Sequence, residues 1–330
     1  MRKWVALLLL AVPPMTRASD VVMDDTTKKA TAKALEWIAA KQNADGSWSE
    51  GRYPHSTAIT ALSLLAFMSQ GHLPGQGLYG PEVAKGTRFL VSAARQSDGY
   101  LVGSRGGNMY CHGLATLALA ELWGMTGDAE VKQTLTRAVD LIVKTQNREG
   151  GWRYDPAPTG ADISVTIMQV MALRAAKNSG LHVPDVTMKQ AIAYIKSCYV
   201  PSQGGFVYQP FSSKTGFARS AAGVCVLQLA GEYDAREIPK AVAYLKENFN
   251  AREYFWYGHY YAAHAMHQIG GKEWEDWYAR IRTTFLALQS DDGSWSRAAS
   301  DKEGVGPVYT TSIAVIALSV PASYLPIFQR

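Results

Sequence analysis

The stretch KTQNREGGWRYDPAPTGADISVT, Lys144–Thr166, runs from a Gln through a Gly-Gly-Trp turn and a Pro-rich loop to an Asp before an apolar segment. Two other stretches read almost the same, KQNADGSWS at Lys41–Ser49 and LQSDDGSWS at Leu288–Ser296. Self-similarity at a fixed spacing is the signature of a repeat architecture. The repeated turn therefore decides the fold, and single residues are interpreted within it.

The chain contains six copies of a unit in which a helix, a Gly-aromatic turn and a second helix follow one another, with a period of roughly 50 residues. The turns are QNADGSW ending at Trp48, QSDGY at Tyr100, QNREGGW at Trp152, QGGF at Phe206, EYFW at Trp256 and QSDDGSW at Trp295. Three of them keep a Gln six positions before the Trp. We predict that the Trp packs on the end of the preceding helix and that the Gln amide bonds backbone groups there.

The two helices of each unit differ in character. The segment before the turn is amphipathic, as in KKATAKALEWIAAKQ at Lys28–Gln42, and is predicted to face water on one side. The segment after the turn is apolar nearly all round, as in STAITALSLLAFM at Ser56–Met68, and is predicted to be buried. Six outer and six inner helices in alternation predict an all-α fold, an (α/α)6 toroid of six helix-hairpin repeats.

An open solenoid is the alternative arrangement of such repeats, but it leaves its terminal inner helices uncovered unless they are capped. The last inner segment, VYTTSIAVIALSV at Val308–Val320, is as apolar as the middle ones, which favours a closed ring. In that ring we expect Trp48, at the first turn, to be less enclosed than Trp152, and its replacement to cost less stability.

The first twenty residues, MRKWVALLLLAVPPMTRASD, have the layout of a secretory signal peptide, with basic residues, a short apolar run and a small-residue site. We predict a signal peptide at residues 1–18, one toroid domain at residues 19–330, and export to the periplasm or the cell exterior. The formal net charge of +5 gives no indication of a nucleic-acid partner. The three cysteines, Cys111, Cys198 and Cys225, are predicted to be small buried residues, and Cys198 with Cys225 is the pair to test as a disulfide.

The Gln-Gly-Trp units resemble the QW repeats of the squalene and oxidosqualene cyclases, and the predicted ring resembles the toroid shared with protein prenyltransferase beta subunits. The resemblance covers essentially the whole chain after residue 18. It implies an isoprenoid or other apolar ligand inside the ring. In the cyclases an acidic Asp-x-Asp-Asp motif protonates a carbon-carbon double bond. That motif falls on Thr159–Asp162, where only the last acidic position is kept, so Asp162 is the candidate catalytic acid.

In such a ring the beginnings of the inner helices gather at one end. Polar and aromatic side chains occupy these beginnings: His55, Ser56, Tyr110, Cys111, His112, Asp162, Ser164, Phe217, Arg219, Tyr257, His259, Tyr260, Tyr261, Tyr309 and Thr310. The predicted ligand-binding residues are His55, Tyr110, His112, Phe217, Arg219, Tyr257, His259, Tyr260 and Tyr309. Aromatic faces among them would stabilise a carbocation.

Asp162 has two other interpretations. An Asp just before an apolar helix is a typical N-cap, whose carboxylate accepts hydrogen bonds from free amide groups of the first turn. Arg219 lies in an apolar helix and needs a partner, and Asp162 is the nearest candidate. That pairing would lower the pKa of Asp162 and favour ligand binding over proton donation.

No cofactor is expected, with zinc as an alternative. Cys111, His112 and His259 are the ligand types that prenyltransferase beta subunits use, but the Asp-x-Cys motif of that family is absent, because Cys111 follows Asn-Met-Tyr. His264 and His267, three residues apart, are interpreted as core or interface histidines.

Three functions stay open at this point. The first is a terpene-cyclase- or prenyltransferase-like toroid that acts on or binds an isoprenoid or another apolar small molecule or lipid, with peripheral membrane contact. The second is a non-catalytic exported toroid that binds a lipid, a peptide or a glycan. The third is a glycan-cleaving toroid, which needs two carboxylates across its cavity. The sequence does not indicate an oligomeric state.

Overall fold

The computed structural model describes residues 21–103, 106–296 and 303–329, so the predicted signal peptide at residues 1–18 lies outside the described residues. The outer helices are α1 (Asp25–Ala39), α3 (Gly80–Ser92), α5 (Ala129–Lys144), α7 (Asp185–Ser197), α9 (Ile238–Glu247) and α11 (Gly271–Leu288). The inner helices are α2 (Thr57–Met68), α4 (Met109–Thr126), α6 (Ile163–Asn178), α8 (Phe217–Leu229), α10 (Phe255–Ile269) and α12 (Pro307–Ser319). The remaining elements are β1 (Trp48–Glu50), β2 (Tyr53–Ser56), β3 (Tyr199–Val200), β4 (Gly205–Phe206), η1 (Val320–Ala322) and η2 (Pro326–Phe328).

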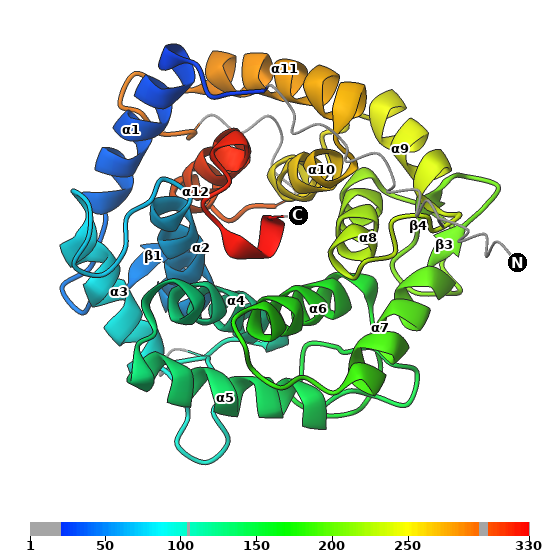
Figure 1. The fold of residues 1–330 in the computed structure, drawn as a ribbon, viewed down its shortest axis with the longest axis horizontal. Helices are drawn as coiled ribbons and strands as arrows, with labels where there is room; N and C mark the ends of the chain where they lie inside the picture. The colour runs from blue at the N-terminus through cyan, green and yellow to red at the C-terminus, as the bar shows by residue number, and fades with distance from the viewer. Residues whose placement is uncertain (1–20, 104–105, 297–302, 330) are drawn as a thin grey trace, which may run out of the picture.

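The helices form a closed ring of two layers (Figure 1). Each inner helix contacts the next one along the chain, and the last, α12, contacts the first, α2. The N-terminal helix α1 contacts both α11 and α12, so the outer layer is closed as well. The predicted (α/α)6 toroid is confirmed, and the open solenoid is wrong. Within the described residues no helix has the length and apolar character that crossing a membrane requires.

Burial in the two layers follows the sequence pattern. In the inner helix α2 every residue except Ala58 is buried. In the outer helix α1 the buried residues recur at three- and four-residue spacing on one face: Thr27, Ala30, Thr31, Ala34, Leu35 and Ile38. The inner layer therefore forms the core, and its helices are held in place on all sides.

The Trp of each complete turn joins the two helices of its own repeat. Its indole Nε1 donates to a carbonyl near the end of the outer helix: Trp48 to Ile38 (2.7 Å), Trp152 to Ile142 (2.8 Å) and Trp295 to Phe285 (2.7 Å). Its backbone N–H donates to a threonine hydroxyl of the inner helix: Thr60, Thr166 and Thr311. The predicted packing of the Trp is confirmed. The expectation that Trp48 is less enclosed is wrong, because its side chain is as inaccessible as that of Trp152.

The Gln of each complete turn has a different partner from the one predicted. Its Nε2 group bonds the carbonyl of its own turn glycine and also a carbonyl of the following outer helix: Gln42 to Glu82 (2.8 Å), Gln146 to Thr187 (2.9 Å) and Gln289 to Ala30 (2.9 Å). The turn glycine must lie close to that next helix, and at Gly150 (φ 93°) an added Cβ would be 2.3 Å from the carbonyl oxygen of Gln190. The Gln therefore joins one repeat to the next.

The fifth repeat departs from this pattern. Trp256 is the second residue of α10, so the prediction that it closes a Gly-aromatic turn is wrong. The sequence before it, EYFW, has no glycine, and the chain enters α10 through Tyr254 in the left-handed region (φ 52°). Trp256 packs instead against Phe285 of α11, with ring centroids 4.9 Å apart.

All three cysteines are free. Cys198 and Cys225 are buried and Cys111 is half-buried, as expected for small apolar residues. The pair Cys198 and Cys225 does not form a disulfide in this structure.

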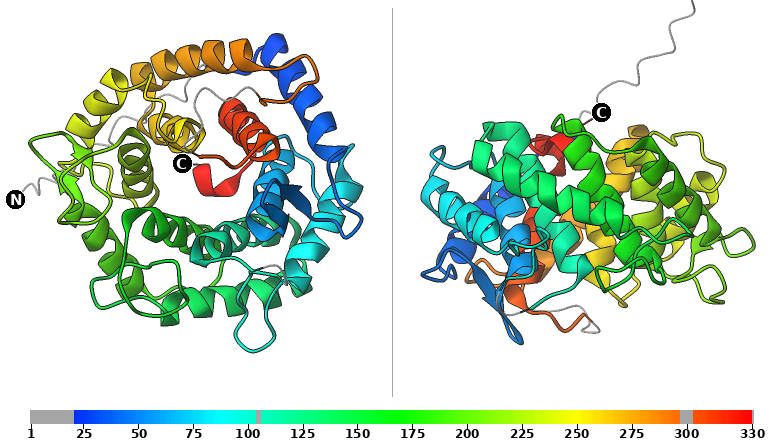
Figure 2. Two further views of the ribbon diagram at one scale, coloured as in Figure 1. Left: turned by 180° about the vertical axis from the view of Figure 1, so that it is seen from behind. Right: turned by 90° about the horizontal axis from the view of Figure 1, so that it is seen from below.

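Beyond α12 the chain turns back into the ring (Figures 1 and 2). η1 follows α12 directly, and after Ser323 (φ 53°) the segment Leu325–Phe328 lies among the inner helices, where η2 contacts α4 and α6. Leu325, Ile327 and Phe328 are buried. The chain itself thus fills one end of the ring interior.

Candidate functional site

Tyrosines from opposite sides of the ring meet at the end where the inner helices begin. Tyr110 lies in the first turn of α4 and Tyr257 in the first turn of α10, helices that are not neighbours in the ring, and their ring centroids are 6.2 Å apart. Tyr261 packs against Tyr257 at 4.8 Å. The side chains therefore span the ring axis, and we call Tyr110, Tyr257, Tyr261 and Tyr309 the tyrosine cluster.

Burial raises the pKa of every member of this cluster. The pKa of Tyr257 is raised to about 12, and those of Tyr110, Tyr261 and Tyr309 lie well above the ordinary value. The hydroxyl groups of Tyr110, Tyr257 and Tyr261 are close enough to affect one another's pKa, but neither Tyr257 nor Tyr261 completes a well-formed hydrogen bond. Unpaired hydroxyl groups in a buried site are costly, so this cluster has hydrogen-bonding capacity that a ligand could use.

Asp162 is the N-cap of α6, and its Oδ1 atom accepts the backbone N–H of Val165 at 3.0 Å. The residue is fully buried, and within the described residues its Oδ2 atom makes no well-formed hydrogen bond. Burial raises the pKa of this carboxyl, although the Val165 amide, the Tyr208 hydroxyl and the Arg153 charge act in the opposite direction. The N-cap interpretation is confirmed, and the second oxygen is left available for another partner.

The predicted pairing of Arg219 with Asp162 is wrong. The Arg219 side chain donates from Nη2 to the backbone carbonyl of Lys214 at 3.1 Å. Within the described residues, Arg219 and Asp162 form no ion pair. Arg219 is only half-buried, so part of its guanidinium reaches solvent, while its buried Nε atom makes no hydrogen bond within the described residues. The pKa of Asp162 is accordingly raised and not lowered.

Asp162 acts on the tyrosine cluster. Its charge raises the pKa of Tyr257, while the nearby hydroxyl of Ser164, in the first turn of α6, lowers that pKa. Tyr208 approaches the same carboxyl from the loop before α8, and its hydroxyl lies 3.1 Å from that of Tyr154. The carboxyl therefore lies between the cluster and a second pair of tyrosines that the sequence analysis did not single out.

Glu303 brings another carboxyl to this end of the ring. Its Oε1 atom accepts the backbone N–H of Tyr257 at 3.2 Å, at the start of α10. It also raises the pKa of Tyr309 through its charge. Glu303 was not among the predicted site residues, because it lies in the loop before α12 and not at a helix start.

Two predicted histidines face the outer layer. His112 accepts the backbone N–H of Leu101 at Nδ1 (3.1 Å) and donates from Nε2 to the carbonyl of Ala138 in α5 (3.1 Å). His259 donates from Nε2 to the carbonyl of Phe249 (3.2 Å). Burial lowers the pKa of His112 to about 4 and that of His259 to about 3, so both are neutral core residues.

The remaining predicted residues lie in three different surroundings. His55 lies on β2, where its Nδ1 atom is 2.7 Å from a carboxylate oxygen of Asp45 in the first turn. Phe217 of α8 packs against the His259 ring of α10 at 5.0 Å and against Trp277 of the outer helix α11. Tyr260 lies inside the ring, between Tyr261 (4.9 Å) and Phe328 (6.5 Å). The structure thus brings Tyr110, Asp162, Tyr257, Tyr260 and Tyr309 together inside the ring.

The alternative zinc set of Cys111, His112 and His259 is not assembled. Each imidazole Nε2 pairs with a backbone carbonyl of a different segment. Among the described residues, no three His, Cys, Asp or Glu side chains are arranged to hold a metal ion.

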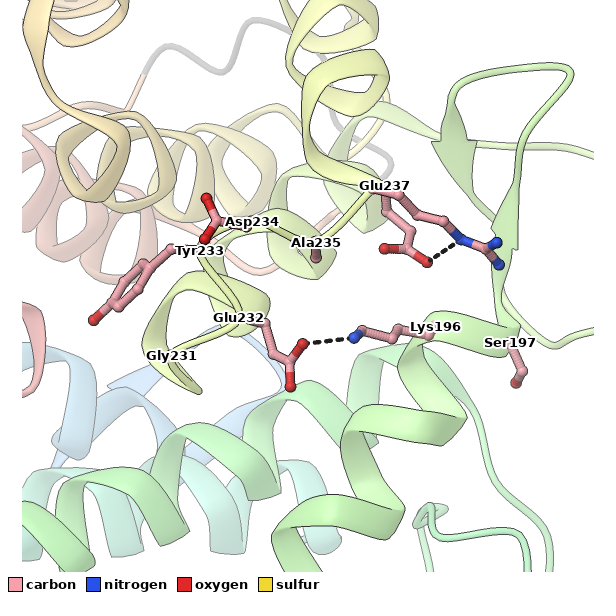
Figure 3. A pocket seen from close by; sticks show the side chains of 9 residues that line it. Lys196, Ser197, Gly231, Glu232, Tyr233, Asp234, Ala235 and Glu237 are labelled. Carbon is pink, nitrogen blue, oxygen red and sulfur yellow. Dashed lines mark hydrogen bonds and ion pairs between the residues drawn. The ribbon is translucent and has the colours of Figure 1, made fainter.

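An open groove of about 820 Å³ lies at the periphery of the other end of the ring, between the end of α7 and the loop from α8 to α9 (Figure 3). Its charged side chains pair with one another: Lys196 with Glu232 at 2.6 Å and Arg236 with Glu237 at 3.3 Å. Lys196 and Glu232 are partly exposed, and Arg236 is exposed whereas Glu237 is buried, so water screens both pairs at least in part. Neither Asp162 nor a member of the tyrosine cluster lines this groove.

Residues 108–265 match the family model of the prenyltransferase alpha-alpha toroid domain, which spans α4 to most of α10. The matched region therefore has the alpha-alpha toroid fold of the prenyltransferase domain. In this toroid the matched segment contains Tyr110, Asp162 and Tyr257. No curated protein sequence matches the chain.

Solved structures of three different enzymes share the toroid fold. An α-1,6-mannanase from a Salegentibacter species has a TM-score of 0.70 at 8% identity, covering 90% of this chain and 99% of its own. A cellobiose 2-epimerase from Bacillus thermoamylovorans has a TM-score of 0.66 at 11% identity, with 90% and 99% covered. A variant of the type II terpene cyclase MstE from Scytonema, in complex with its substrate geranylgeranyl dihydroxybenzoate, has a TM-score of 0.63 at 14% identity, with 91% and 98% covered. Such likenesses show the toroid fold alone.

Proposed function

We propose that this toroid binds and acts on an isoprenoid or another apolar unsaturated ligand, with Asp162 as the proton donor. The observation that carries the proposal is the fully buried Asp162 carboxyl, whose Oδ2 atom makes no well-formed hydrogen bond within the described residues and whose neighbour is the tyrosine cluster. A carboxyl with a raised pKa keeps its proton at higher pH, which a general acid requires. The N-cap bond to Val165 holds the side chain in place.

The tyrosine cluster suits the charge that such a proton transfer creates. The Asp162 proton adds to one carbon of a double bond, and the positive charge develops on the other carbon. The faces of Tyr110, Tyr257 and Tyr261 carry negative quadrupole charge that stabilises a cation. Loss of a proton from an adjacent carbon to the Asp162 carboxylate then restores the acid and leaves a rearranged double bond.

A ligand must part the tyrosines to enter. Tyr110 and Tyr257 meet across the ring axis, so the path to Asp162 opens only when these two side chains move. The terpene cyclase MstE, whose structure contains a geranylgeranyl substrate, supports this class of ligand through its shared fold.

The cellular setting is also a proposal. We propose that residues 1–18 direct export and that the protein meets its apolar ligand at a membrane surface. Fractionation of cells that express the full chain tests the first part, since the mature protein should be recovered outside the cytoplasm. Recovery of uncleaved chain in the cytoplasmic fraction contradicts it.

Geranylgeraniol is a suitable probe for the proposed activity. Binding is measured by calorimetry and product formation by gas chromatography with mass spectrometry, for the natural protein, for Asp162→Asn and for Asp155→Asn. Asp155 is exposed in the loop that leads to Asp162, so its variant is a matched control for the loss of one carboxylate. We expect Asp162→Asn to bind the probe and form no product, and Asp155→Asn to behave as the natural protein.

Two results contradict the proposed function. If none of the three proteins binds geranylgeraniol, the ligand class is wrong. If Asp162→Asn forms product at the natural rate, Asp162 is not the acid. A mannooligosaccharide serves as the comparison probe, and its cleavage would favour the glycan-cleaving alternative.

A further inference from the structure

The wall of the ring at the end opposite the tyrosine cluster carries polar side chains in an otherwise apolar interior. Glu121 lies on α4 and Gln268 on α10, and both are almost fully buried. Burying such groups without hydrogen bonds is costly, so their partners show what the wall accommodates. Glu121 accepts the backbone N–H of Ile327 at its Oε2 atom (3.3 Å), and Gln268 donates from Nε2 to the backbone carbonyl of Phe328 (2.6 Å).

These two bonds match the polypeptide backbone. They bind the N–H of one residue and the carbonyl of the next, which are the alternating groups of a peptide. A hydrocarbon chain at the same place would leave both Glu121 and Gln268 unpaired, at a cost in affinity. The wall is therefore suited to a peptide and not to the apolar tail of an isoprenoid.

The side chains of the bound segment fit the wall closely. The Phe328 ring stacks on the His264 ring with centroids 3.4 Å apart and an interplanar angle of 6°, and it also approaches Tyr260. Leu325 and Ile327 are buried beside it. The gap left among His264, Phe328 and their neighbours has a volume of about 10 Å³, at the lower limit of space for one water molecule.

The segment Leu325–Phe328 is joined to the rest of the ring only through a short connection after η1. It follows η1 through Ser323, which is in the left-handed region (φ 53°), and Tyr324, which is 51% exposed. No outer helix covers it (Figures 1 and 2). Its contacts are concentrated on the inner faces of the helices that surround it, in the manner of a bound peptide whose main chain supplies hydrogen bonds and whose side chains fill pockets.

We propose that this end of the ring is a peptide-binding site, specific for a short apolar segment with an aromatic residue, which the chain's own residues Leu325–Phe328 occupy. The proposal does not depend on the apolar-ligand function at Asp162, because it rests on other polar groups, Glu121 and Gln268, and concerns a different class of ligand, although Tyr260 contacts both Tyr261 and Phe328.

The test separates the segment from its site. A chain that ends at Ser323 is prepared, and a peptide of residues 324–329 with acetylated and amidated ends is added. We expect one peptide to bind per chain by calorimetry and to raise the melting temperature of the shortened chain. A peptide with alanine in place of Phe328 should bind about tenfold more weakly or worse, since it loses the stack on His264.

A peptide with alanine in place of Gln329 is the matched control. The Gln329 side chain is exposed, and the bond given for it goes to the backbone carbonyl of Ser323, outside the buried wall, so this peptide should lose far less affinity than the Phe328 variant. In the shortened chain, Gln268→Leu should weaken the natural peptide, because it removes the donor to the Phe328 carbonyl.

Two outcomes overturn the proposal. One is a shortened chain that keeps its helical circular dichroism and binds no peptide. The other is a shortened chain that takes up geranylgeraniol at this end in place of the peptide, with Gln268→Leu improving that uptake. If the shortened chain does not fold, the full-length Phe328→Ala protein replaces it. There the added natural peptide should displace the weakened segment and raise the melting temperature, and no effect overturns the proposal.

Discussion

The side-chain amide of Gln289 donates to the backbone carbonyl of Ala30, 2.9 Å away, and so joins the sixth repeat to the first helix. The same geometry joins Gln42 to α3 and Gln146 to α7, so the closure of the ring reuses the contact that holds adjacent repeats together. Arg282 of α11 adds bonds to Asp24 and Thr27 at the start of α1. Closure therefore needs no special element, because the Gln of the sixth repeat binds α1 in the same way as the Gln of an earlier repeat binds the next outer helix.

The change Gln289→Leu should destabilise the closed ring. It removes the bonds to Ala30 and to the turn glycine Gly293, and leaves partly buried carbonyls with fewer partners. We expect a loss of about 1–3 kcal/mol in the free energy of unfolding, measured by urea denaturation. Gln96→Leu is the control, since that side chain is exposed and should shift stability by less than about 0.5 kcal/mol. Equal midpoints for both variants would show that the amide does not hold the ring closed.

Trp48→Ala and Trp152→Ala should have similar effects. Both indoles are fully buried, and both donate to a carbonyl of the preceding outer helix. Each change removes a large aromatic side chain and leaves an unpaired carbonyl, at a cost of about 3–5 kcal/mol in the free energy of unfolding. Thermal melts of the two variants should coincide within a few degrees. A nearly neutral Trp48→Ala would mean that the first repeat is held by other contacts.

Substitutions of Asp162 should separate its cap role from its acid role. Asp162→Asn keeps a capping oxygen and should change the free energy of unfolding little, whereas Asp162→Ala loses the cap at a cost of about 1 kcal/mol. Because Arg219 bonds Lys214 and not Asp162, Arg219→Met combined with Asp162→Asn should show additive effects. A coupling free energy above about 1 kcal/mol in that double-mutant cycle would restore the ion pair that the structure lacks.

Glu121 should make stability depend on pH. Burial raises its pKa in the folded state from the ordinary 4.5 to about 8. The folded state therefore holds this proton more tightly than the unfolded state does. The stabilising contribution is complete below about pH 4.5 and is lost as the pH rises through about 8, by a few kcal/mol. Urea denaturation at about pH 5 and at about pH 9 should show the natural protein to be weaker at the higher pH.

Glu121→Gln is the control for this dependence, because glutamine keeps the size of the side chain and an oxygen that can accept the Ile327 amide. The stability of this variant should vary less between the two pH values. The neighbouring Tyr260 has a strongly raised pKa and does not titrate in this range. An unchanged pH dependence in Glu121→Gln would place the titrating group elsewhere.

The ring could be predicted from the sequence because its signals are local and repeated. Each Gly-Trp turn uses a glycine with positive φ, and each inner helix is apolar on all sides, so both are visible within about 20 residues. The predicted partner of the Gln was wrong because the real partner is distant in the sequence. The carbonyls of Glu82 and Thr187 lie 40 and 41 residues away, and nothing in the turn identifies them.

The sequence predicted at which end of the ring the candidate residues lie, but not which way their side chains face. Residues at the beginnings of inner helices do gather at one end of the ring, but a helix start does not show whether a side chain faces the axis or the outer layer. Tyr257 and His259 are two residues apart, and one lies against Tyr110 across the axis while the other bonds Phe249. Glu121 was visible as the one acidic residue in an apolar segment, yet its partner Ile327 lies 206 residues away.

The bond between Gln289 and Ala30 also has a consequence for the order of folding. It joins residues 259 positions apart, whereas the equivalent bonds of Gln42 and Gln146 can form as soon as the next outer helix has been synthesised. During synthesis the face of α1 that Gln289 contacts therefore stays exposed until the sixth repeat has been synthesised. A second unfinished chain nearby can offer its own sixth repeat to that face, so a domain-swapped dimer is the misassembly to which this ring is most prone.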